Sequence, residues 1–162
     1  MDSVVSEHKN KLIHLKDSQG GFALGVDGLI DILLSLRVNA LQLRESEQRR
    51  AFVRALAKGD VLLLKASSAV LLDMFLVPSH ALKCALSALL SILASTSEGL
   101  DYLTRGGADA AALEKLVDLL KDQDDGSVTQ RFCLAGLQKA CYLGTPALVE
   151  ALVVKKGAIE WL

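Results

Sequence analysis

The side chains that could do chemistry are few, and the sequence does not bring them together. The three histidines, His8, His14 and His80, are not grouped with cysteines or carboxylates at the spacing of metal ligands. Cys133 and Cys141 are eight residues apart on one predicted helix, where small apolar core residues are their expected role. Because the chain has three cysteines and no Cys-x-x-Cys pair, we expect free thiols and a reducing compartment.

Two other segments have the composition of a ligand site but lack its pattern. Residues 20–28 are glycine-rich and precede a predicted helix, yet they lack the Gly-Lys-Ser/Thr ending of a phosphate loop. The acidic turn at 122–125 lacks the spacing of a calcium loop. We therefore predict no catalytic residue, no cofactor and no metal, and hence a protein that is not an enzyme. A helical enzyme or ligand-binding domain with a cryptic site stays open, and an enclosed pocket with two or more buried titratable groups would favour it.

The one local excess of charge is basic. Its members are Arg49, Arg50, Arg54 and Lys58, of which the last three are four residues apart and share one face of a predicted helix. A solvated helix face is the ordinary explanation. The functional alternative is a contact for an acidic partner such as a tubulin tail. The net charge of −1 gives no global attraction to nucleic acid or to anionic membranes.

Composition favours helices packed on helices. Apolar residues make up 51% of the 162 residues and aromatic residues only 4%, and leucine and alanine dominate. The mean hydropathy of +0.36 is high, but Lys65, Asp73, Pro78, His80 and Lys83 interrupt the most apolar region, residues 61–94. We predict no membrane-spanning helix, no secretory signal and an intracellular location.

Apolar periodicity, capping residues and helix-stop residues predict a series of short helices. Residues 1–17 could form one amphipathic helix, Ser95–Glu98 form a predicted capping box, and Pro78 suits a first helical turn. Asp109 and Thr145-Pro146 are also predicted to begin helices. The other predicted helices cover 26–38, 46–58, 61–64, 67–76, 79–94, 97–104, 109–121, 127–142 and 145–156.

A basic residue followed by glycine ends a predicted helix three times. The glycines are Gly59, Gly106 and Gly157, which are 47 and 51 residues apart. The cation complements the helix dipole, and the glycine can take the left-handed conformation of a helix stop. Residues 83–89 also align with 131–137 at a shift of 48, which places Ala88 over Gly136, where close helix packing would require small residues. Such a period is typical of a helical solenoid.

The sequence therefore predicts one helical domain over 1–162. It divides into an N-terminal helix and linker (1–20), three repeat units (21–58, 59–107 and 108–157), and the start of a further repeat (158–162).

The most regular unit resembles an armadillo repeat. It has an apolar helix, an acidic turn, a long helix that contains Leu134-Ala135-Gly136-Leu137, a short helix and Lys156-Gly157. The resemblance implies an all-α fold, a right-handed superhelix (α-solenoid) of about three repeats. Peptide-binding armadillo proteins carry Trp and Asn on the groove-lining helix, whereas 79–94 and 127–142 have neither. A peptide clamp on those helices is therefore not expected.

A narrower resemblance covers residues 126–131, 134–139 and 153–162, which are similar to the LisH-domain-containing armadillo-repeat ciliary proteins. It implies a noncatalytic protein-binding scaffold in the cytoplasm and cytoskeleton, near basal bodies and axonemal microtubules, with ciliary or microtubule-associated partners. The alternative within this class is a cytosolic adaptor for trafficking or nuclear import. We expect Trp161 and Leu162 to be apolar and uncovered, so that further repeats or a partner would pack on them. The candidate partner-binding residues are Arg49, Arg50, Arg54, Lys58 and Trp161.

Overall fold

The computed structural model describes residues 2–13, 25–43, 45–64, 70–105 and 109–161. Over these residues the chain is helical and contains no strand, so the predicted all-α class is confirmed. No helix in these ranges is long and apolar enough to cross a membrane. The elements are α1 (Asp2–Ile13), α2 (Gly25–Gln42), α3 (Ser46–Gly59), α4 (Val70–Met74), α5 (His80–Leu93), α6 (Ser97–Leu103), α7 (Ala111–Lys121), α8 (Val128–Leu143), α9 (Pro146–Glu150), the π-helical turn η1 (Ala151–Lys155) and the 3₁₀ turn η2 (Ala158–Glu160).

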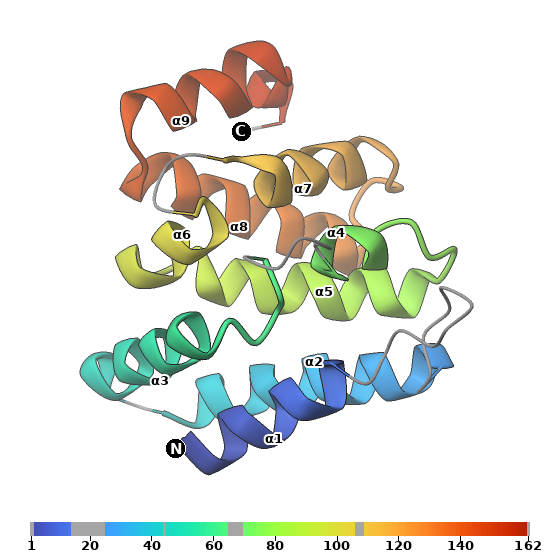
Figure 1. Cartoon of the computed structure of the whole chain (residues 1–162). Coiled ribbons are helices and arrows are strands. Elements are labelled where there is room, and N and C mark those ends of the chain that lie inside the picture. The colour runs from blue at the N-terminus through green and yellow to red at the C-terminus, as the bar shows by residue number, and fades with distance from the viewer. Residues whose placement is uncertain (1, 14–24, 44, 65–69, 106–108, 162) are drawn as a thin grey trace.

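Helices three elements apart in the chain pack on one another. The central row consists of α2, α5 and α8, in which α5 contacts α2 on one side and α8 on the other (Figure 1). In the same way α3 contacts α6, and α4 contacts α7. α5 therefore links the N-terminal and C-terminal helices of the described chain.

The apolar stripes predicted for the helices form the core. On α5, the predicted ridge of Leu82, Leu86, Leu89 and Leu93 is at most 1% exposed, and the buried residues of this helix run without a break from Ala85 to Leu93. The predicted stripes of α2, α3 and α7 are buried as well. A helix buried on nearly all sides is apolar around its whole circumference, which explains the high hydropathy of this region.

Close packing in the central row depends on Gly136. A Cβ atom at this position of α8 would lie 3.2 Å from the Cα of Ser91 on α5. The predicted close approach at Gly136 is therefore confirmed, and Ala88, which aligns with it in the repeat, is also buried.

Several predicted helix starts are confirmed, and two are wrong in detail. The Thr145 hydroxyl accepts a hydrogen bond from Leu148 N, with Pro146 in the first turn. Asp109 Oδ1 accepts one from Ala111 N, but the N-cap of α7 is Ala110, so Asp109 lies one residue before the cap. The predicted capping box does not form, because the cap of α6 is Thr96, which accepts from Gly99 N.

Proline and the predicted short helices also differ from expectation. Pro78 precedes the N-cap Ser79, so it lies outside α5 rather than in its first turn. Residues 61–64 form a turn instead of a helix, and Leu63 has a positive φ of 51°. Of the helix predicted over 67–76, α4 covers Val70–Met74, while 67–69 lie outside the described residues. The helix predicted over 145–156 is α-helical only to Glu150 and continues as η1.

The predicted glycine stops are confirmed at one site of three. Gly157 has φ 68°, in the left-handed region. After α3 the left-handed residue is Asp60 (φ 47°), and Gly59 is the last helical residue. After α6 it is Arg105 (φ 50°), and Gly106 lies outside the described residues.

Candidate functional site

The predicted basic cluster lies on α3, and its first member has a structural role. Arg49 Nε donates to the carbonyl of Ala40 at 3.3 Å, and its Nη2 donates to the carbonyl of Leu43 at 3.1 Å. The last carbonyls of a helix have no partner within the helix, and a cation there also complements the helix dipole. Arg49 therefore closes the end of α2 instead of presenting its charge to a partner.

Arg50 and Arg54 face two carboxylates. Arg50 Nη2 lies 2.9 Å from Glu98 Oε1 on α6, and its Nε donates to the same oxygen at 3.0 Å. Arg54 Nη2 donates to Glu47 on its own helix, and its Nη1 lies 3.9 Å from Glu98. The hydrogen bond from Arg50 is the main reason why the pKa of Glu98 is lowered. Two cations and two anions are thus balanced on this surface, and α3 is tied to α6.

The two remaining candidates behave differently from each other. Lys58 is exposed and makes no ion pair with any residue in the described ranges. Trp161 is half-buried and packs against the hydrophobic core, so the expectation that it would be uncovered is wrong. Leu162 lies outside the described residues. Of the five predicted site residues, Lys58 is therefore the one that presents an unpaired charge.

The two histidines in the described residues, His8 and His80, lie on different helices. His8 is buried, with Nε2 3.1 Å from Ser35 Oγ on α2, whereas His80 is exposed at the start of α5. His14 lies outside the described residues. Within the described part of the chain, no three His, Cys, Asp or Glu side chains are grouped so that they could hold a metal ion.

The thiols are free, and one of them is shielded. Cys133 is fully buried between α8 and α5, and burial raises its pKa to about 12. Cys84 and Cys141 are half-buried. A raised thiol pKa keeps Cys133 protonated and unreactive, as expected of a core residue.

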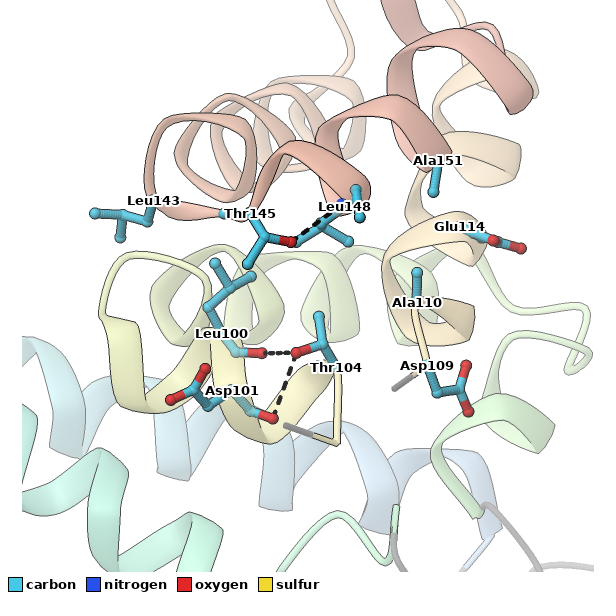
Figure 2. Close-up of a pocket in the computed structure, with 12 residues that line it drawn as sticks. Leu100, Asp101, Thr104, Asp109, Ala110, Glu114, Leu143, Thr145, Leu148 and Ala151 are labelled. Carbon is cyan, nitrogen blue, oxygen red and sulfur yellow. Dashed lines mark hydrogen bonds between the residues drawn. The ribbon is translucent and has the colours of Figure 1, made fainter. Parts of the chain in front are cut away.

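A pocket that the sequence did not predict opens between α6, the start of α7 and α9 (Figure 2). We call it the α6–α9 pocket. Its volume is about 340 Å³. Its lining residues are Leu100, Asp101 and Thr104; Asp109, Ala110 and Glu114; and Leu143, Gly144, Thr145, Ala147, Leu148 and Ala151.

The hydroxyl groups in this pocket are already hydrogen-bonded. Thr104 Oγ1 donates to the carbonyl of Leu100 at 2.9 Å, and Thr145 Oγ1 is the cap of α9. Figure 2 shows the Leu100 side chain pointing toward Thr145 and Leu148. Apolar and polar groups therefore both line the pocket.

Carboxylates lie around the edge of the pocket. Asp109 Oδ2 is 3.3 Å from Arg105 Nη1, and Glu114 Oε2 is 3.6 Å from Lys156 Nζ. Asp101 is exposed and has no such partner among the described residues. The side chains of Asp109 and Glu114 are 36% and 37% exposed, so the pocket lacks the buried titratable pair that would favour an enzyme.

Sequence reasoning missed this pocket because its walls come from separate parts of the chain, residues 100–114 and 143–151. Two local sequence features lie in the pocket wall: Thr145-Pro146 begins α9, and Asp109 precedes α7. Neither feature predicts that these two segments line the same pocket.

Comparison of the chain with family models, curated proteins and solved structures gave no match.

Proposed function

We propose that the chain is a noncatalytic protein-binding scaffold, built as a short armadillo-type right-handed superhelix of about three repeats. The observation that carries the proposal is the packing of each helix on its counterpart three elements further on: α2 on α5, α5 on α8, α3 on α6 and α4 on α7. In a stack of repeats each unit buries its apolar face against the next one, which requires this order of contacts.

The proposed units agree with these contacts. Residues 21–58 contribute α2 and α3, residues 59–107 contribute α4 to α6, and residues 108–157 contribute α7, α8 and α9 with η1. Four pairs of equivalent helices in neighbouring units touch, α2 with α5, α5 with α8, α3 with α6 and α4 with α7. Residues 158–162 would begin the next unit.

Exposed apolar side chains favour protein contacts over catalysis. Leu34, Val38 and Leu41 follow one another at helical spacing on α2 and are 40%, 46% and 48% exposed. Apolar side chains grouped on a surface are typical of sites where other proteins bind. A helical stack with a buried centre would hold such a face in a fixed position.

We place the scaffold at cilia or basal bodies, on the resemblance of residues 126–139 and 153–162 to ciliary armadillo-repeat proteins. The test is the location of the tagged protein in ciliated cells. We expect it to coincide with a basal-body or axonemal marker. A diffuse cytosolic or a nuclear distribution would contradict this placement and favour the adaptor for trafficking or nuclear import.

A contact with acidic tubulin tails is proposed for the α3 surface and needs a variant that keeps the fold. Reversal of Arg50 or Arg54 would break their contacts with Glu98 and Glu47, so we choose Lys58→Glu. Lys139→Glu, at an exposed position of α8, is the matched control. We expect Lys58→Glu to co-sediment less with microtubules, with a larger difference at low salt. Unchanged binding, or no binding by the wild type, would remove tubulin as the partner of this surface.

A further inference from the structure

The walls of the α6–α9 pocket are suited to an apolar side chain. Leu100, Leu143 and Leu148 line it together with three alanines, and its volume of about 340 Å³ is at the small end of the range for ligand sites. Its two threonine hydroxyls make hydrogen bonds within the protein. An apolar group could therefore cover Thr104 without leaving its hydroxyl proton unsatisfied.

The charged residues that line this pocket are acidic. Its charged lining residues are Asp101, Asp109 and Glu114, and no cation belongs to the wall. Arg105 and Lys156 neutralise the last two, which leaves Asp101 as the carboxylate without a partner among the described residues. A charge of opposite sign on the ligand would complement it.

We propose that the α6–α9 pocket binds a basic, apolar segment of a partner protein, with one large apolar side chain between Leu100 and Leu148 and a neighbouring lysine or arginine at Asp101. This inference rests on the proposed scaffold function and gives the chemistry of one partner. The pocket is formed by the end of α8 and by α6, α7, α9 and the start of η1, so it does not require Trp or Asn on α5 or α8.

The geometry also sets the expected specificity. An acidic segment would bring its carboxylates next to Asp101, Asp109 and Glu114, and like charges in contact weaken association. The partner of this pocket is thus of opposite charge to the partner proposed for the α3 surface. Binding should weaken with added salt, because Asp101 is exposed.

The test is selection of short random peptides displayed on phage against the whole chain, followed by affinity measurement with synthetic copies of the enriched peptides. We expect enrichment of one large apolar residue flanked by lysine or arginine. Asp101→Lys reverses the unpaired charge and should weaken binding by at least about fivefold at low salt. Ala147→Trp fills the pocket from an exposed position of α9 and should weaken it about tenfold or more.

Glu150→Lys, an equivalent charge reversal on α9 outside the pocket, is the control and should leave the affinity unchanged. Each variant is first compared with the wild type by circular dichroism and urea unfolding. The proposal for the pocket is contradicted if the enriched peptides are acidic, or if they bind Asp101→Lys and Ala147→Trp with the same affinity as the wild type. Neither result contradicts the scaffold proposal. No enrichment at all also overturns the pocket, while the scaffold is judged separately by its location in cells.

Discussion

A buried tyrosine fixes the turn that follows α3. The hydroxyl of Tyr102 on α6 accepts a hydrogen bond from Leu62 N at 2.9 Å and donates one to Asp60 Oδ1 at 3.0 Å. The same Asp60 oxygen accepts from Leu64 N. These bonds hold Asp60 in the left-handed conformation, which the sequence analysis had predicted for Gly59. A short polar side chain with local hydrogen bonds tolerates this conformation.

Tyr102→Phe should therefore destabilise the protein. The variant leaves Leu62 N–H buried without a partner, which should cost about 1–3 kcal/mol at neutral pH. Burial raises the pKa of Tyr102, so the folded state keeps its proton when the unfolded state loses it. The stability of the wild type should fall above pH of about 10, the ordinary value, and the variant lacks this contribution. Urea unfolding from neutral to alkaline pH should show the gap between the two proteins narrowing, and a constant gap would contradict the assignment.

Two glycines are required by close contacts, and they differ in severity. A Cβ atom at Gly99 would lie 2.1 Å from the carbonyl oxygen of Leu93, while one at Gly136 would lie 3.2 Å from Ser91 Cα. Alanine in a helix is normally favoured over glycine by about 1 kcal/mol. We expect Gly99→Ala instead to lose about 2–3 kcal/mol and Gly136→Ala distinctly less. Denaturant unfolding measures both, and equal or increased stability of Gly99→Ala would show that the contact is absent.

Individual residues could be predicted where their role is local or repeats along the chain. Gly136 was found because it aligns with Ala88 in the neighbouring unit. The bonds of Tyr102 with residues 60–62 and of Arg49 with the end of α2 could not be found, because they join parts of the chain whose relative position depends on the fold. The same reason explains why the basic cluster looked unpaired.

Among the elements, the helices with a strong apolar period were predicted closely. The stripes of α5 and α7 follow directly from leucine spacing, and Thr145 begins a helix as expected. The helix predicted over 61–64 does not form. The hydrogen bond from Leu62 N to the Tyr102 hydroxyl holds these residues in a turn, although their apolar pattern is typical of a helix. Prediction also failed for the capping box, because Glu98 bonds to Arg50 and Thr96 takes over the cap.

The contact between α3 and α6 should depend on pH through Glu98. Its pKa is lowered chiefly by the hydrogen bond from Arg50, so this contribution to stability is present above the ordinary value of the carboxyl. It is lost as the pH falls through the lowered pKa. Glu98→Gln should be less stable than the wild type at neutral pH and equally stable in acid. Thermal unfolding across this range measures the difference, with the more exposed Glu47→Gln as the control of smaller effect.

In the molecule as a whole, the sequence predicted the number and order of the helices better than their mutual arrangement. The period of 47 to 51 residues led to the proposed stack, and the contacts of α5 with α2 and with α8 support that proposal. The α6–α9 pocket could not be predicted, because no local pattern fixes the distance between residues 100–114 and 143–151. A binding surface for partner proteins depends on how the helices are arranged in space, so the sequence predicted it less well than the helices themselves.

Native-state hydrogen exchange tests the proposed stack as a whole. In a row of repeats, each unit contacts only its neighbours, so the ends can open without unfolding the centre. We predict that amides of α5, packed between α2 and α8, exchange most slowly, and that α1 and the segment α9–η2 exchange through openings of lower free energy. A single free energy of opening for every helix would mean one closed cooperative bundle, and would contradict a scaffold built of stacked repeats.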